Sequence, residues 1–342
     1  MARYVIRRLL QAIPLLLLIS LVLFFLMQAS GDPLATLGSR QPPRAEDRER
    51  LMRQLGLDQP VHVQYIYWLV GNDWVVVNTD AEGNPEYGTR KGAIRGDFGT
   101  SFVTRQPAIE VIAERLPNTL ILMLTAEVLI IGASLVIGIV SAIRQYSMLD
   151  NILTTFSFIM FSVPIFLMAY ILMFIFAIRF REWGLPYFPI SGMFDPIEGR
   201  TASQVIWHMV LPVLSISLIS IAGYSRYVRS NMLEVIHSDY IRTARSKGIS
   251  ERRTLFVHAF KNASLPLVTL IGLDLPLLIG GAVVTETIFA WPGMGRLFID
   301  HLNRSDFPVL MGLLMLISVA VVVFQLLTDL TYTLLDPRIR FA

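Results

Sequence analysis

The sequence has no cysteine among its 342 residues, which excludes disulfide bonds, thiolate metal sites and a cysteine nucleophile. It also lacks the GxxxxGK(S/T) loop that cradles nucleotide phosphates and the HExxH and GxSxG patterns of common hydrolases. The histidines are isolated from one another and are expected to be solvated or to cap helices; they are His62, His208, His237, His258 and His301. No catalytic residue, no metal site and no cofactor bound by this chain is predicted.

Charge is also scarce. Only 16% of the residues are charged, 54% are apolar, and the mean hydropathy is +0.57. These values are typical of a protein that crosses a lipid bilayer several times. The net charge of +3 is too small to suggest a nucleic-acid partner, so membrane lipid is the expected surrounding.

Six apolar segments are long enough to cross a hydrocarbon core about 30 Å thick. They are Leu9–Met27, Thr119–Ile143, Ile152–Ile178, Val205–Gly223, Ser264–Val284 and Val309–Leu335. The first exceeds the apolar core of a signal peptide and no good cleavage site follows it, so it is expected to be retained. The predicted fold class is therefore an all-α polytopic membrane protein with six transmembrane helices.

The basic residues set the expected orientation. The long segment 31–118 is left out of the count, because long loops cross the membrane regardless of their charge. In the remaining segments, fourteen Lys and Arg residues fall in the termini and short loops on one side of the six spans, and five fall in the short loops on the other side. The positive-inside rule places the richer side, with both termini, in the cytoplasm. Three regions follow: residues 1–30 with the first helix, an extracytoplasmic domain over 31–118, and a five-helix core over 119–342 with a cytoplasmic loop at 225–262.

The segment 31–118 is polar, and no part of it is apolar enough to span a membrane. Glu46–Leu55 has the pattern of a helix, whereas Trp74–Asn78 followed by the turn-rich Ala81–Glu86 suggests a β-hairpin. An α+β extracytoplasmic insertion between the first two membrane helices is expected.

The stretch Asp239–Pro266 lies between two apolar segments and carries six Lys and Arg residues. Each such charge costs roughly 2.5 to 3.5 kcal/mol at the bilayer centre, so the stretch must lie in water. Two short helices are predicted, Tyr240–Lys247 and Glu251–Phe260, with a bend at Gly248 and Ser250 as the cap of the second. Each helix has one apolar face, which suggests a docking surface for another protein; the apolar residues are Tyr240, Ile241, Ala244, Leu255, Phe256, Ala259 and Phe260.

Three acids lie in or near the apolar segments, where ionisable groups are candidates for function. Asp274 stands beside Leu275-Pro276 in a helix expected to be broken, and two interpretations remain open. In the first, Asp274 and Pro276 line a polar path, and Asp274 meets a cationic group of a substrate. In the second, Asp274 is a buried acid that pairs with a hydroxyl group or a basic residue on a neighbouring helix. Glu127 and Asp329 are expected to make helix contacts.

The basic loop resembles the signature of the permease subunits of ATP-binding cassette importers. That signature is EAA, three residues, glycine and a later LP, and here it reads Arg242-Thr243-Ala244, three residues, Gly248 and Leu265-Pro266. The Arg in first position and the longer spacing to LP resemble the oligopeptide, dipeptide and nickel branch, in which the string D-Y-(I/V)-R-T-A-R-(A/S)-K-G is typical. Further strings in the order of that branch are the first apolar segment with Gly31-Asp32-Pro33, Gly96–Ser101, Ser162–Phe166, His208–Pro212, Glu286–Arg296, Arg304–Pro308 and Asp336–Arg340. Residues 72–95 look like an insertion relative to that branch.

This resemblance implies the type I importer permease fold and a bacterial or archaeal cytoplasmic membrane. It also implies four further subunits: a second, related permease, two cytoplasmic ATPases that bind ATP and Mg, and an extracytoplasmic substrate-binding protein. The loop would couple to an ATPase, and the residues implied are Asp239, Tyr240, Arg242, Thr243, Ala244, Arg245 and Gly248.

Peptides are the expected cargo, and nickel chelates or oligosaccharides are the alternatives within the same family. Two other classes remain open from the residues alone. One is an ion-coupled transporter that works without partners, and the other is a sensor whose inner loop docks an effector.

Overall fold

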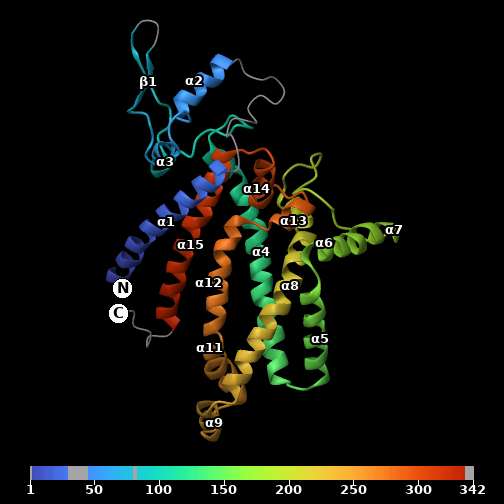
Figure 1. Ribbon diagram of the computed structural model, residues 1–342. Helices are drawn as coiled ribbons and strands as arrows, with labels where there is room; N and C mark the ends of the chain where they lie inside the picture. The colour runs from blue at the N-terminus through green and yellow to red at the C-terminus, as the bar shows by residue number, and fades with distance from the viewer. Residues whose placement is uncertain (1, 30–44, 80–82, 336–342) are drawn as a thin grey trace. The chain divides into compact units, whose positions relative to one another are not determined.

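The computed structural model describes residues 2–29, 45–79 and 83–335, and this part of the chain is mostly helical (Figure 1). The strings Gly31-Asp32-Pro33 and Asp336–Arg340, and the start of the predicted turn at 81–86, lie outside the described residues. The chain forms two compact units. Unit 1 contains residues 1–117 and 297–322, and unit 2 contains residues 118–296 and 323–342.

Within the described residues, five helices are long and apolar enough to cross a membrane. They are α1 (Ala2–Ala29), α4 (Ala108–Ile143), α8 (Ala202–Ile236), α12 (Leu265–Gly280) with its continuation α13 (Val283–Ile288), and α15 (Phe307–Leu335). A sixth span is reached if one bent helix pair is counted as a single crossing.

The bent pair begins with α5 (Met148–Ser162) and continues through α6 (Ile165–Met173), the π-helix η2 (Phe174–Arg179) and α7 (Phe180–Glu182). The two halves differ in direction by 105°. Pro164 explains the bend, because a proline disfavours the helical conformation of the preceding residue, and Val163 is extended with φ −83° and ψ 123°.

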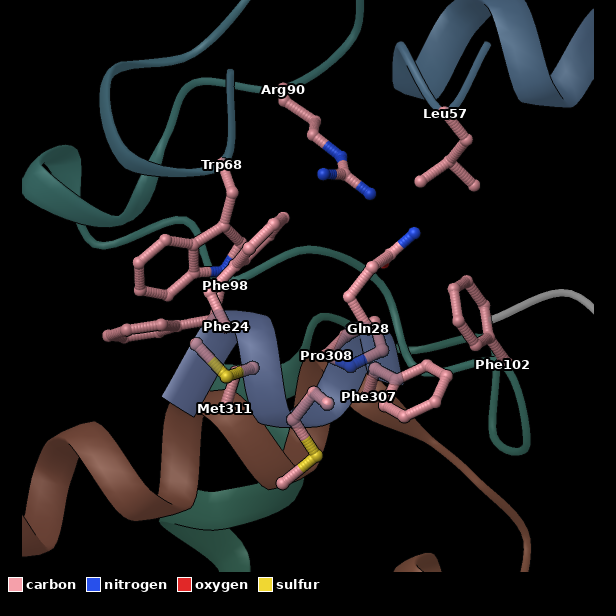
Figure 2. Close-up of a pocket in the computed structure, with 11 residues that line it drawn as sticks. Phe24, Gln28, Leu57, Trp68, Arg90, Phe98, Phe102, Phe307, Pro308 and Met311 are labelled. Atoms are coloured by element: carbon pink, nitrogen blue, oxygen red, sulfur yellow. The ribbon is translucent and has the colours of Figure 1, made fainter. Parts of the chain in front are cut away.

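Unit 1 joins the first helix to a small folded segment. This segment contains α2 (Ala45–Leu55), α3 (Val61–Val70), η1 (Ala93–Arg95) and an antiparallel hairpin of β1 (Val76–Thr79) and β2 (Pro85–Tyr87). Phe24 of α1, Trp68 of α3 and Met311 of α15 pack together as the apolar core and line one wall of a small pocket (Figure 2).

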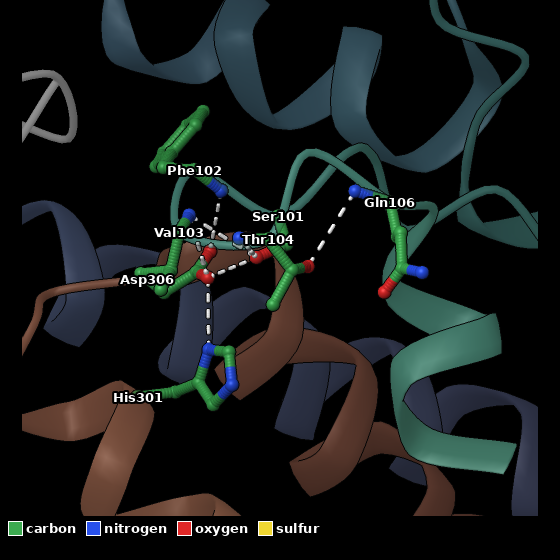
Figure 3. A network of polar contacts seen from close by, with 7 residues as sticks. All are labelled: Ser101, Phe102, Val103, Thr104, Gln106, His301 and Asp306. Carbon is green, nitrogen blue, oxygen red and sulfur yellow. Dashed lines mark hydrogen bonds and ion pairs between the residues drawn. The ribbon is translucent and has the colours of Figure 1, made fainter. Parts of the chain in front are cut away.

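A buried carboxylate holds two distant segments of unit 1 together (Figure 3). Asp306 is fully buried, and it accepts hydrogen bonds from the Ser101 hydroxyl, the Phe102 amide at 3.0 Å and His301 Nδ1 at 2.8 Å. Burial raises the pKa of Asp306, but these hydrogen bonds outweigh burial and bring its pKa below the usual value. The strings Gly96–Ser101 and Arg304–Pro308 therefore meet through a single side chain.

Unit 2 is organised around α8, which contacts α5, α6, α11 (Phe260–Ala263), α12 and α13. Helix α4 approaches α8 closely at Gly138, where an added Cβ would lie 2.7 Å from the Ser225 carbonyl oxygen. A small residue is needed at such a crossing because any side chain would force the two backbones apart.

The fifth apolar segment is broken, and the break lies at Gly281. Helix α12 continues through Pro276 and ends at Gly280, and Gly281 has a φ of +77° before α13 begins. An L-residue pays a steric cost at such a φ, whereas glycine does not, so the break occurs at the glycine. Pro276 lies inside the helix and is buried.

Candidate functional site

The basic loop forms two helices joined by a sharp bend at the end of α8 (Figure 1). The first is α9 (Asp239–Ser246), separated from α8 by His237 and Ser238 alone. The second begins with α10 (Glu251–Arg253), passes through the π-helix η3 (Thr254–Ala259) and ends with α11. Gly248 has a φ of +75°, which accounts for a glycine at the bend. We call residues 239–263 the knuckle.

Most of the apolar face of α9 is buried, which corrects the prediction of an exposed docking face, and only Tyr240 of that face remains exposed. Ile241 is 0% exposed and Ala244 8% exposed, and Ile241 packs with Met232, Ala259 and Leu267. Leu255 and Ala259 are buried as well. Helical periodicity shows which residues share a face, but it does not show whether that face is covered by the same chain.

The exposed surface of the knuckle is basic and carries a few aromatic and aliphatic side chains. Five of the seven predicted coupling residues have exposed side chains there, namely Asp239, Tyr240, Arg242, Thr243 and Arg245. Gly248 is exposed too, and only Ala244 is turned inward. Phe256 and Val257 of the second helix add an apolar part, each about half exposed.

An ion pair fixes the two helices of the knuckle to each other. Arg245 contacts Glu251 with both ends of its guanidinium, at 2.7 and 3.1 Å. The hydrogen bonds from Arg245 lower the pKa of Glu251 below its usual value, so the pair persists at neutral pH. Ser250 occupies the predicted N-cap position, but its side chain makes no capping hydrogen bond, which corrects that part of the prediction.

The inward position of Ala244 leads to a labelling prediction. The chain has no native cysteine, so Thr243→Cys and Ala244→Cys each introduce the only thiol. Because Thr243 is exposed and Ala244 is buried, we expect a maleimide to modify Ala244→Cys at least about tenfold more slowly in the folded protein. Equal rates before unfolding, with equal labelling after it, would contradict the packing described for α9.

A second ion pair, missed by the sequence analysis, ties α5 to the same end of α8. Asp150 is buried, and it accepts hydrogen bonds from Arg229 Nε and Nη2, both at 2.8 Å, and from the Ser141 hydroxyl. Ser147 caps α5 by accepting a hydrogen bond from the Asp150 amide. A cap of this kind has a local sequence signal, but the ion pair has none, because Arg229 lies 79 positions after Asp150 in the sequence.

The three membrane acids differ in their surroundings. The Tyr224 hydroxyl donates a hydrogen bond to Asp274. Of the two interpretations of Asp274, this contact is the one expected if the acid pairs with a hydroxyl on a neighbouring helix. Asp274 is nonetheless only partly buried. Glu127 is buried, and one of its oxygens has no hydrogen-bond partner among the described residues. Asp329 is buried on α15.

Another buried carboxylate explains the string Glu286–Arg296. Glu286 is fully buried and accepts hydrogen bonds from the Thr119 hydroxyl at 2.9 Å and the Arg296 amide at 3.0 Å. Gly293 approaches this carboxylate so closely that a Cβ would clash with it. Trp291 is also fully buried and donates to the Asn118 carbonyl at 2.9 Å. These side chains fix the irregular segment after α13.

The described residues contain no cluster of three or more His, Asp or Glu side chains placed to hold a metal ion. What unit 2 presents is a set of membrane helices with a basic knuckle at one end and an acid-bearing interior. This arrangement is that of a multi-pass membrane protein.

Family models and relatives identify the class. A model described as the inner membrane component of binding-protein-dependent transport systems matches residues 134–341, and a model of the N-terminal part of such components matches residues 1–123. The chain therefore belongs to this family, whose members are permease subunits in the inner membrane that work with a partner ATPase and a substrate-binding protein.

The chain is similar over its whole length to several curated proteins. It is 40% identical to the oligopeptide transport system permease protein AppB of Bacillus subtilis, with 100% of both chains covered. It is 35% identical to a probable peptide ABC transporter permease protein of Sinorhizobium fredii, again with 100% of both covered. It is 33% identical to the dipeptide transport system permease protein DppB of Escherichia coli, with 99% of both covered. The resemblance found from the motifs is confirmed.

Proposed function

We propose that this chain forms one half of the translocation pathway of an ATP-driven importer for dipeptides or oligopeptides. One observation supports the proposed mechanism above all: the spanning helix α8 leads directly into the knuckle, with only two residues between α8 and α9. The names of full-length relatives support peptides as the cargo. Nickel chelates and oligosaccharides are the alternatives within the family.

The proposed assembly pairs this chain with a second, related permease. Two cytoplasmic ATPases supply ATP and Mg²⁺ binding, and an extracytoplasmic protein delivers the solute. In the proposed topology the bent pair α5–α7 counts as one crossing, which gives the six spans of a type I importer permease. The α+β segment within 31–118 faces outward, and both termini and the knuckle are cytoplasmic. An impermeant maleimide should then modify Thr243→Cys only in inverted vesicles, and modification in intact cells would overturn the orientation.

Helix α8 is well suited to carry movement between the knuckle and the membrane. Its 35 residues extend roughly 52 Å, which exceeds the hydrocarbon thickness of about 30 Å. Its last turns therefore reach into water as one rigid rod with its membrane part. Because Arg245 fixes the second knuckle helix to the first, a push on the exposed surface moves both and turns α8 with them.

Reconstitution tests this function. Proteoliposomes that contain the chain, its partner permease, the ATPases and a loaded binding protein should accumulate peptide only when ATP is present. Accumulation by the chain alone, driven by an ion gradient, would instead establish a stand-alone transporter. Ligand-dependent docking of an effector without any uptake would establish a sensor.

For the pathway we expect the Asp274→Asn variant to slow uptake of peptides with a free amino terminus by about tenfold, because a carboxylate attracts a cation strongly where water is scarce. Asparagine keeps an acceptor for Tyr224 and removes only the charge. The rate of uptake at saturating loaded binding protein is the measurement.

The matched variant for this prediction is Tyr224→Phe, which keeps the carboxylate and removes its hydroxyl donor. If Asp274 serves only to pair with Tyr224, the Tyr224→Phe variant should lose stability while Asp274→Asn transports normally. Normal uptake by Asp274→Asn would therefore remove Asp274 from the pathway.

A further inference from the structure

Unit 1 contains a small pocket that the transport function does not use (Figure 2). It has a volume of about 50 Å³, and its walls come from the end of α1, from α3, from the loop at Phe98 and from the start of α15. A water molecule needs roughly 10 to 15 Å³ of such space, so the pocket holds a group of a few oxygen-sized atoms. Phe24, Trp68, Phe98 and Met311 form its apolar part.

The polar groups at the pocket point to an anionic ligand. Within the part of the chain that the structure describes, Arg90 Nε is buried without a hydrogen-bond partner, and the same is true of the Trp68 indole Nε1. Figure 2 shows the Arg90 guanidinium and the Gln28 amide directed toward each other across the mouth. No Asp or Glu is among the described residues that line the pocket. Buried donors without acceptors are costly, and an oxyanion would satisfy them.

Arg90 keeps its charge under ordinary conditions. Burial lowers the pKa of Arg90 to about 10, and the nearby charge of Asp97 partly opposes this shift. The Arg90 side chain is therefore positively charged at neutral pH, and the negative charge of Asp97 balances this positive charge only weakly.

The pocket lies where two candidate membrane spans end. The span in α1 runs to Ala29 and the span in α15 begins at Phe307, so Gln28 and Pro308 mark the boundary between hydrocarbon and water. Helix α3 between them has an aromatic run, Tyr65-Ile66-Tyr67-Trp68, and Ile66 is 46% exposed. Aromatic residues of this kind favour the level of the lipid headgroups.

We propose that this pocket binds the phosphate group of a membrane phospholipid. Arg90 supplies the charged contact to the phosphate oxygens, and the Gln28 amide and the Trp68 indole supply further donors. Phe24 and Met311, at the ends of the two spans, contact the start of the acyl chains. Binding at this point would fix α3 against the ends of α1 and α15 within unit 1.

The test uses the full-length chain in a detergent with an uncharged sugar headgroup and phosphatidylglycerol as the probe. Native mass spectrometry should detect bound lipid, and the lipid should raise the unfolding temperature. The Arg90→Gln variant should bind the lipid at least about tenfold more weakly, because a charge-assisted contact is lost. The matched control is Arg105→Gln, which removes the same charge from an exposed position in unit 1 and should bind as the native chain does.

The second variant, Trp68→Phe, keeps the ring and removes the N–H donor, so the proposal stays testable if Arg90→Gln fails to fold. It should weaken lipid binding by several-fold. If Arg90→Gln and Arg105→Gln weaken lipid binding equally, the lipid is attracted only by the net charge of the protein, and the proposal is overturned. Saturable binding of glycerol 3-phosphate as tight as that of the lipid would assign the pocket to a free phosphate ester and would also overturn it.

Discussion

The Gly248→Pro variant should insert into the membrane normally and should lose uptake by roughly a hundredfold. Proline fixes φ near −65°, whereas Gly248 has a φ of +75°, and its amide donates to the Arg245 carbonyl at 3.0 Å. Proline also disfavours the conformation of Lys247, which has φ −79° and ψ 4°, because a residue before proline is pushed towards extended ψ values. A cost of about 3 kcal/mol or more at the bend should displace α9 from the second knuckle helix. The measurements are uptake and ATP hydrolysis in the reconstituted transporter, and hydrolysis should continue without transport.

The matched control is Gly248→Ala. No atom lies within 4 Å of a Cβ added at Gly248, so alanine causes no clash and only the backbone strain of about 1 to 2 kcal/mol remains. We expect this variant to retain much of the uptake. Native uptake in Gly248→Pro would remove the bend from the coupling mechanism, and equal loss in both variants would assign the effect to general strain.

The Arg229→Ala variant should lower the free energy of unfolding by about 3 kcal/mol. It leaves Asp150 buried with its charge uncompensated, and the remaining Ser141 hydroxyl and Tyr146 amide are neutral donors. The same change releases α5 from the end of α8 next to the knuckle. Denaturant unfolding of the purified chain measures the loss, and uptake should fall with it.

The double variant Arg229→Ala with Asp150→Asn provides the control. It removes the unpaired charge while it keeps an acceptor for Ser141, so stability should recover by at least half. Arg144→Ala, in the same region but without an ion pair among the described residues, should be close to native. No recovery in the double variant would show that Arg229 acts by packing and not by its charge.

Local chemistry made the knuckle predictable. The charges of this stretch exclude it from hydrocarbon, and helix formers on both sides of Gly248 predict two helices with a bend, as observed. Hydropathy likewise located the apolar segments. A spanning helix makes its backbone hydrogen bonds within its own segment, so its position can be predicted from that segment alone. The third segment was less predictable, because Pro164 converts it into two helices at 105° to each other.

The corrections concern contacts between distant segments. Periodicity placed Ile241 and Ala244 on one face, but only the packing of Ile241 on Met232 and Ala259 shows that this face is turned inward. The sequence predicts a broken helix in the fifth segment, and only the structure places the break at Gly281, close to the buried Glu286 carboxylate. Ser101 lies 205 residues from Asp306 and Arg229 lies 79 residues from Asp150, so neither of these two contacts has a local signal in the sequence.

The sequence by itself determined the class of protein and the positions of its apolar segments, and it predicts that the basic knuckle lies in water, because these depend on transfer free energies that each residue carries independently. Only the tertiary structure decided which side of the knuckle is exposed, where the fifth span breaks, and which carboxylates are paired. Those properties depend on which segments pack together, and a burial or a hydrogen bond between distant residues exists only once the chain has folded.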